Sequence, residues 1–170
     1  KPIFADIGDD NLISPQSVAN KITSKTKAIM PTQLNGRCAN MDMLQSLASQ
    51  HNLLLIEDSA QGLGARFRGQ CAGTFGAFGT LSFYPAKLIG CFGDGGAVLT
   101  NDDELAAEIA LLRDHGRDKS GAVVAWGTNS RLDNLQAAFL KLRLRHYDED
   151  IARRREIARK YTEGLCAVPE

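Results

Sequence analysis

The chain has 170 residues, which is enough to bury one sizeable hydrophobic core, and nothing in its composition indicates several modules. Its 20 Lys and Arg balance its 20 Asp and Glu, so no overall field would attract nucleic acid or an anionic membrane. No apolar run approaches the ~18 to 20 residues that a membrane-spanning helix needs, and the N-terminus lacks a signal-peptide pattern.

The cysteines are scattered along the chain, with no CxxC pair and no histidine at metal-ligand spacing beside them. We therefore expect free thiols in a reducing compartment, no metal site and a cytoplasmic protein. The chain opens without Met in a strand-like run and stops just after a long helical pattern, so we interpret it as a segment of a longer protein. The cysteines are Cys38, Cys71, Cys91 and Cys166.

Short apolar runs alternate with helical patterns through the first part of the chain. This alternation favours an α/β fold of three layers, in which helices flank a mostly parallel sheet. The runs are short and apolar, as strands buried on both faces should be. We expect strands at residues 3–7, 28–31, 53–56, 80–84 and 97–100.

Apolar residues at helical spacing mark the covering helices. Ser14 as N-cap and Pro15 in the first turn predict a helix at residues 15–22, and the pattern predicts a second helix at 41–50. The Asn-Asp-Asp run at residues 101–103 is expected to cap a third helix.

The rest of the chain is predicted to be a loop followed by helix. Residues 116–127 lack a clear period and are expected to form a loop. From Ser130 onward the pattern is helical, which predicts a long C-terminal helical segment. Acidic residues flank the arginines at 153–155, so this run is interpreted as a solvated helix face and not as a binding patch.

An acidic cluster follows the strand expected at 53–56. The run Glu57-Asp58-Ser59-Ala60-Gln61 brings two carboxylates and an amide to the carboxyl end of a buried strand. Ligands of open parallel sheets bind outside these strand ends, which favours a site here. Acid-ended strands also bind magnesium or only cap the next element, so the pattern alone leaves these readings open.

A lysine, Lys87, follows the strand expected at 80–84, and a Gly-rich stretch at residues 90–96 comes next. A lysine that forms an imine must lose its proton, which a partly desolvated pocket at a strand end favours. A lone lysine is more often a solvated surface charge. The glycines lead into a strand and do not open a helix, so they indicate a tight turn and not a dinucleotide fingerprint.

Together these runs resemble the sugar-aminotransferase branch of the fold type I pyridoxal-phosphate enzymes, the DegT/DnrJ/EryC1/StrS family. The resemblance covers essentially the whole chain, and the stretches occur in the family's order. It implies that residues 1–146 form an incomplete cofactor-binding large domain and that residues 147–170 form a helix leading to an absent small domain. The matching stretches are 57–61 (EDSAQ), 82–87 (SFYPAK), 93–102 (GDGGAVLTND), 112–116 (LRDHG) and 129–133 (NSRLD).

The resemblance implies pyridoxal 5′-phosphate as cofactor and a role for each of five residues. Lys87 would be the Schiff-base lysine that also moves the proton, and Asp58 would pair with the pyridine nitrogen. Gln61 would lie near the phenolic oxygen, and Ser82 would bind the phosphate. Asn129 would reach the cofactor phosphate of the neighbouring subunit, so the family site is built across a homodimer. For Ser82 and Asn129 a local turn or cap role stays open.

The implied reaction transfers an amino group from an amino acid, with glutamate expected, to a nucleotide-linked keto sugar. Two other functions stay open. One is a sugar dehydratase, whose relatives carry histidine where this chain has Lys87. The other is a non-catalytic fragment that folds or dimerises, because the phosphate loop that begins family members and the small domain that ends them are not in this sequence.

Two departures from the family pattern concern the substrate. Many relatives have Pro-x-His-x-Tyr-Gly where residues 31–36 of this chain place two amides, Gln33 and Asn35, which leaves the identity of the sugar open. His115 lies in a matching stretch, but a lone histidine is more often structural, so it is left out of the catalytic set.

Overall fold

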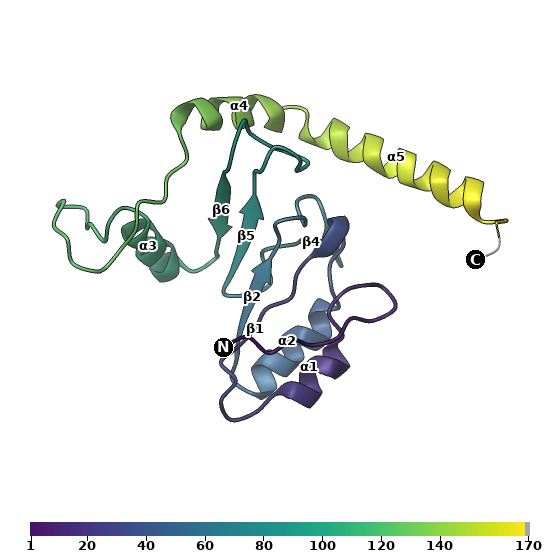
Figure 1. Cartoon of the computed structure of the whole chain (residues 1–170), viewed down its shortest axis with the longest axis horizontal. Helices are drawn as coiled ribbons and strands as arrows, with labels where there is room; N and C mark the ends of the chain where they lie inside the picture. The colour runs from purple at the N-terminus through teal and green to yellow at the C-terminus, as the bar shows by residue number, and fades with distance from the viewer. Residues whose placement is uncertain (169–170) are drawn as a thin grey trace.

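A four-stranded sheet forms the centre of the computed structural model, which describes residues 1–168 (Figure 1). The strand order is β1-β2-β5-β6, in which β1, β2 and β5 run parallel and β6 is antiparallel to β5. The predicted α/β fold with a mostly parallel sheet flanked by helices is confirmed. The strands are β1 Ala28–Ile29, β2 Leu54–Asp58, β5 Phe78–Ser82 and β6 Gly96–Leu99.

Two helices, α1 (Pro15–Lys21) and α2 (Met41–Gln50), pack with β1 and β2 around the larger hydrophobic core. The Ser14 side chain accepts a hydrogen bond from the N–H of Ser17, which confirms it as the N-cap of α1. Met41 and Leu44 of α2 are fully buried in this core. Burying these apolar side chains fixes one face of β2, because alternate residues of a strand point to opposite faces.

Three helices follow the sheet: α3 (Asp103–Leu112), α4 (Asn134–Leu144) and α5 (Tyr147–Leu165). Asp102 is the N-cap of α3, within the run predicted to cap it. The long C-terminal helix is confirmed, and Figure 1 shows α5 extending away from the sheet. Residues 169 and 170 of the segment predicted at 147–170 lie outside the described residues.

A second, smaller core lies beyond the carboxyl end of β5. Ile89 and Cys91, from the loop between β5 and β6, are buried together with Leu140 of α4. Phe92 stacks on Phe139 of the same helix, with ring centroids 4.2 Å apart. These contacts hold α4 against the loop that carries Lys87.

The strand predicted at residues 3–7 is wrong. Ile7 forms only an isolated bridge with Ile13, and Ile3 and Phe4 are exposed. The tight turn at residues 9–12 returns the chain on itself, so this apolar run has no neighbouring strand to pair with.

A short hairpin was not anticipated from the sequence. Strands β3 (Arg66–Phe67) and β4 (Gln70–Cys71) pair through a turn in which Arg68 and Gly69 both have positive φ, 47° and 87°. Turns of this kind match the twist of a hairpin and usually carry Asn-Gly or Asp-Gly. The strands are too short for their residues to show an alternating pattern.

Candidate active site

Asp58 is the last residue of β2, and both neighbouring segments fix its main chain. Its N–H donates to the carbonyl of Pro31 at 3.0 Å, and its carbonyl accepts from the N–H of Gln33 at 2.8 Å. On the other side, Asp58 is in register with Thr80 of β5. The half-buried side chain accepts one hydrogen bond, from the N–H of Ala60 to Oδ1 at 3.1 Å, so Oδ2 is available to a ligand.

The neighbouring carboxylate, that of Glu57, does not join Asp58 at the site. Glu57 is fully buried on the opposite face of β2, where its oxygens accept hydrogen bonds from the loop at residues 73–76 and from Gln33. Of the two carboxylates in the acidic cluster, only that of Asp58 is therefore placed to meet a ligand at the end of the strand. The reason is that β2 runs through to Asp58, and the strand period of two sends adjacent side chains to opposite faces.

Lys87 lies in the loop that leaves the carboxyl end of β5, next to β2 in the sheet. Its main-chain N–H donates to the carbonyl of Tyr84 at 2.9 Å, and the N–H of Cys91 donates to the carbonyl of Phe83 at 2.8 Å. These bonds, with buried Ile89, give the loop a defined shape. The lysine is half-buried and forms no ion pair with any of residues 1–168.

Ser82 is the last residue of β5, the strand that pairs with β2 and precedes the loop bearing Lys87. Its Oγ accepts a hydrogen bond from the N–H of Tyr84 at 3.3 Å. Because the hydroxyl accepts that bond, its own proton remains available to an anion. The local turn role and a phosphate-binding role are therefore compatible.

Gln61 is held by the turn at Leu34–Gly36. Its Oε1 accepts from the N–H of Asn35 at 3.0 Å, and its main-chain carbonyl accepts from Gly36 at 3.0 Å. A main-chain N–H can only donate, so the amide must place its oxygen toward Asn35. The exposed Nε2 group is then the end that can donate to a ligand.

The two amides at residues 31–36 have separate surroundings. Gln33 is fully buried, and its side chain bonds Glu57 and the N–H of Ala39. Gln33 is therefore a core residue, and of the two amides only Asn35 is exposed to a ligand. Asn35 is exposed, with a φ of 53°, and lies beside Gln61.

Asn129 lies apart from the other predicted residues. It belongs to residues 113–133, which we call the arm, and Figure 1 shows this segment projecting away from the sheet between α3 and α4. Asn129 is exposed and bridges to Asp114 at the base of the arm. Trp126 is completely exposed. Asp58 and Ser82 thus end adjacent parallel strands, Gln61 and Lys87 lie in the segments that follow these strands, and Asn129 lies on the arm.

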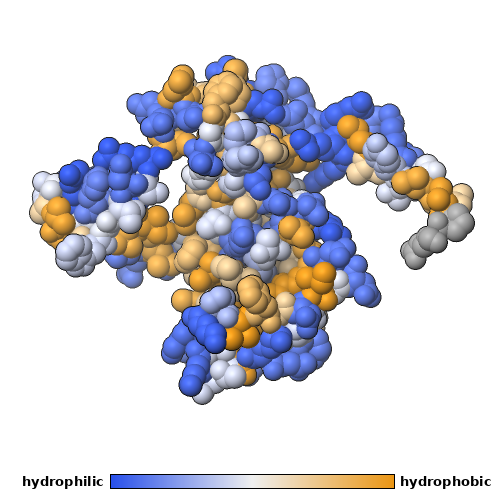
Figure 2. Space-filling view, in the orientation of Figure 1, coloured by the Kyte–Doolittle hydropathy of each residue, from blue (hydrophilic) through white to orange (hydrophobic). Residues whose placement is uncertain are grey.

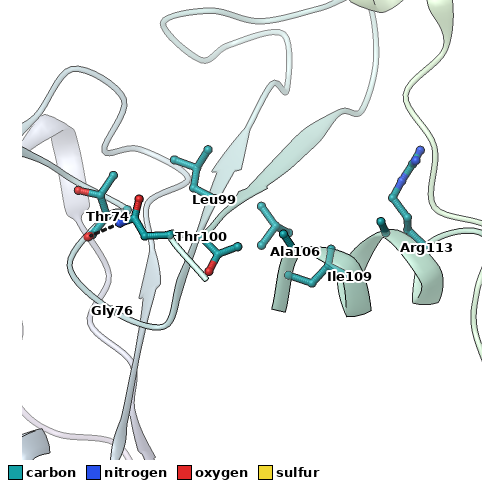
Figure 3. A pocket seen from close by; sticks show the side chains of 11 residues that line it. Thr74, Gly76, Leu99, Thr100, Ala106, Ile109 and Arg113 are labelled. Atoms are coloured by element: carbon teal, nitrogen blue, oxygen red, sulfur yellow. Dashed lines mark hydrogen bonds between the residues drawn. The ribbon is translucent and has the colours of Figure 1, made fainter. Parts of the chain in front are cut away.

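A hollow in the described part of the molecule lies at the other end of the sheet from Asp58 and Ser82. A groove of about 420 Å³ runs between β6 and α3, and Figure 3 shows Leu99, Ala106 and Ile109 along it. It lies where β6 passes into α3, which is the opposite end of the sheet because β6 is antiparallel to β5. Figure 2 shows apolar side chains gathered there, and none of the predicted site residues lines the groove.

The four residues at the sheet edge suit a pyridoxal-phosphate site in their chemistry. They supply an amine, a carboxylate with one free oxygen, a hydroxyl that can donate and an amide whose donor end is free.

Within residues 1–168, no helix combines the length and apolarity needed to cross a membrane. The four cysteines are free.

Comparison with known proteins supports the same chemistry. The model of the DegT/DnrJ/EryC1/StrS aminotransferase family matches residues 1–170. The chain is 45% identical over 161 residues to dTDP-3-amino-3,4,6-trideoxy-alpha-D-glucose transaminase of Streptomyces venezuelae, covering 95% of this chain and 42% of the relative. It is 42% identical to UDP-2-acetamido-2-deoxy-3-oxo-D-glucuronate aminotransferase of Pseudomonas aeruginosa, covering 99% and 47%.

The crystal structure of S. venezuelae DesV in complex with a ketimine intermediate superposes with a TM-score of 0.94 at 43% identity, covering 99% of this chain and 46% of that one. The chain therefore spans slightly less than half the length of these relatives.

Proposed function

Because the chain belongs to the DegT/DnrJ/EryC1/StrS aminotransferase family, we propose that it forms the lysine-bearing part of a pyridoxal-phosphate-dependent nucleotide-sugar aminotransferase. The enzyme would transfer an amino group from an amino acid, with glutamate as the donor, to a nucleotide-linked keto sugar. Residues 1–146 would be part of the large domain, and 147–170 would lead to a small domain. The names of the two curated relatives support amino transfer and a nucleotide-linked sugar.

One observation carries the proposal: Asp58 is the last residue of β2, and the loop bearing Lys87 follows the carboxyl end of β5, the adjacent parallel strand. An acid and an amine that leave the same sheet edge can meet opposite parts of one flat ligand. Ser82 at the end of β5 and Gln61 after β2 supply donors that the local hydrogen bonds leave free.

Each of these residues would have a distinct task. Pyridoxal phosphate, when bound, supplies an electron-accepting ring and a carbonyl for amino groups. The Nζ of Lys87 would hold the cofactor and then move the proton between the donor's α-carbon and the cofactor's C4′ carbon. The carboxylate of Asp58 would keep the ring nitrogen protonated. Gln61 would donate to the phenolic oxygen, and Ser82 to the phosphate.

We further propose a homodimer in which Asn129 serves the partner's cofactor phosphate. Asn129 is exposed at the base of the arm, and Figure 1 shows the arm projecting away from the sheet. The arm also exposes Val123, Val124 and Trp126, apolar side chains that association of two copies would bury.

The other functions make different demands on the chain. In a sugar dehydratase of this family, histidine replaces the lysine, so Lys87 argues against that activity. A non-catalytic fragment would fold without holding the cofactor. The free cysteines support a cytoplasmic location.

The deciding experiment is to titrate the chain with pyridoxal phosphate and record the visible absorbance of bound cofactor. The band should form with the unaltered chain and with Lys119→Ala, which removes an exposed lysine of the arm, and should be missing with Lys87→Ala. A band that survives Lys87→Ala would refute the assigned lysine. For the whole enzyme, amino transfer from glutamate to a panel of nucleotide-linked keto sugars tests the reaction itself.

A further inference from the structure

The buried carboxylate of Glu57 joins three segments of the chain directly behind the proposed site. Its Oε2 accepts from Gln33 Nε2 and from the N–H of Gly73, both at 2.8 Å. Its Oε1 accepts from the N–H of Phe75 at 2.6 Å and from that of Gly76 at 3.2 Å. An isolated carboxylate inside a protein is strongly destabilising, so these four donors are what allow Glu57 to lie there.

Gln33 connects this buried group to Asp58. Its side chain donates to Glu57 and accepts from the N–H of Ala39 at 2.8 Å, so both ends of the amide are engaged. Its main-chain N–H donates to the carbonyl of Asp58 at 2.8 Å. The residue that holds the Glu57 carboxylate therefore also holds the end of β2 from which the Asp58 side chain projects.

The same residue leads into the turn that orients Gln61. Leu34–Gly36 follows Gln33 directly, and the N–H of Asn35 in this turn fixes the Gln61 oxygen. A Cβ added to Gly62, next to Gln61, would lie only 3.0 Å from the Cβ of Gln33, so the two segments are packed closely. A displacement of Gln33 would move the turn and with it the Gln61 amide.

We infer that Glu57 and Gln33 are positioning residues of the cofactor site, which hold the Asp58 carboxylate and the Gln61 amide in place from behind the sheet. The inference rests on the proposed function for what Asp58 and Gln61 bind. The hydrogen bonds that join the four residues do not depend on it. A well-packed apolar pair would fill this space at a lower cost of desolvation, but it could not accept the main-chain N–H groups or fix the turn.

The test compares Glu57→Gln and Gln33→Leu with a control, Val18→Ala. Glu57→Gln keeps the shape but turns an N–H₂ group toward main-chain donors. Gln33→Leu removes the hydrogen bond between Gln33 and Glu57 but leaves Glu57 its three main-chain donors. It therefore tests the inference even if Glu57→Gln fails to fold. Val18 is buried in the same core but lies on α1 and touches neither site residue through a hydrogen bond.

Two readouts are taken for each protein: the pyridoxal phosphate Kd from the lysine-dependent absorbance, and, without cofactor, the NMR signals of the Asp58 carboxyl and the Gln61 side-chain amide. We expect Glu57→Gln and Gln33→Leu each to weaken pyridoxal phosphate binding about tenfold or more and to shift both NMR signals. Val18→Ala should also lower the thermal stability, but it should leave the Kd and both NMR signals unchanged.

Folded variants with wild-type Kd and wild-type signals would overturn the inference. If the unaltered chain shows no lysine-dependent absorbance, the proposed function fails instead. The NMR signals then still test whether Glu57 and Gln33 position Asp58 and Gln61. Unchanged signals in folded Gln33→Leu would refute that role.

Discussion

The guanidinium Nη2 of Arg131 lies 2.9 Å from Oδ1 of Asp114, so an ion pair joins the two ends of the arm. Main-chain bonds from His115 to Thr128 and from Thr128 to Leu112 close the same base. The hydrogen bond from Arg131 holds the pKa of Asp114 below its ordinary value of 3.8. The arm therefore leaves the body of the protein from a closed base and not as a loose loop.

This pair predicts a pH dependence of the arm. Because the folded-state pKa of Asp114 is lowered, its stabilising contribution is present above pH 3.8 and is lost as the pH falls through the folded-state value. Amide exchange protection at His115 and Thr128 should fall in that acidic range. In Arg131→Gln the protection should already be low at neutral pH. Arg117→Gln, which removes a cation 3.9 Å from the same oxygen, should have a smaller effect, and equal effects would contradict the assignment.

The orientation of the Gln61 amide predicts that Gln61→Glu impairs binding without unfolding the protein. Glutamate still offers an oxygen to the N–H of Asn35, but it loses the Nε2 donor and adds a negative charge. We expect about tenfold weaker binding of pyridoxal phosphate, since a hydrogen bond to a charged group is worth about 1.5–3 kcal/mol. Thermal unfolding should hardly change. Gln16→Glu, on the exposed face of α1, adds the same charge and should leave binding intact.

The surroundings of Gly79 and Gly164 predict opposite outcomes for substituting each of them by alanine. A Cβ on Gly79 would overlap the main chain of Gly73, and that backbone cannot yield as a flexible side chain could. Gly79→Ala should therefore destabilise the fold by about 1–3 kcal/mol, as overpacking does. Gly164 in α5 has nothing within 4 Å, so Gly164→Ala should stabilise α5 by up to about 1 kcal/mol. Thermal unfolding followed by circular dichroism measures both, and a lower melting temperature for Gly164→Ala than for Gly79→Ala would refute this account.

The surroundings of Cys38 predict that it resists alkylation. Burial, then the negative charge of Glu57, raises the pKa of the Cys38 thiol to about 11. The thiolate is the reactive form, so almost none is present at pH 8. Iodoacetamide at that pH should modify the exposed Cys71 and Cys166 first, as peptide mass spectrometry would reveal. Early labelling of Cys38 would show that its surroundings are more open than described.

Several elements could be predicted from the sequence because their signals are local. Ser14 before Pro15, and Asp102 before α3, mark helix starts through bonds within one turn. The positions of Asp58 and Lys87 at strand ends follow from the apolar runs that precede them. Residues 3–7 carry the same apolar signal but lack a partner strand, and partner strands are a property of the tertiary fold.

The opposite orientations of the Glu57 and Asp58 side chains can partly be predicted from the sequence. Extending the strand to residue 58 would have sent the two acids to opposite faces, because strand side chains alternate. The burial of Gln33 cannot be predicted from the sequence, because its side chain bonds to Glu57 and Ala39, which come close to it only in the folded chain. No local pattern marks an amide whose partners come from other segments.

The donors that surround Glu57 have a consequence for the order of folding. Three of them, the N–H groups of residues 73, 75 and 76, follow Glu57 in the chain. During synthesis β2 leaves the ribosome before these donors do, and an uncompensated carboxylate resists collapse into the apolar interior. We therefore expect β2 to dock stably against α2 only once the segment ahead of β5 is available, so that the two halves of the sheet form together.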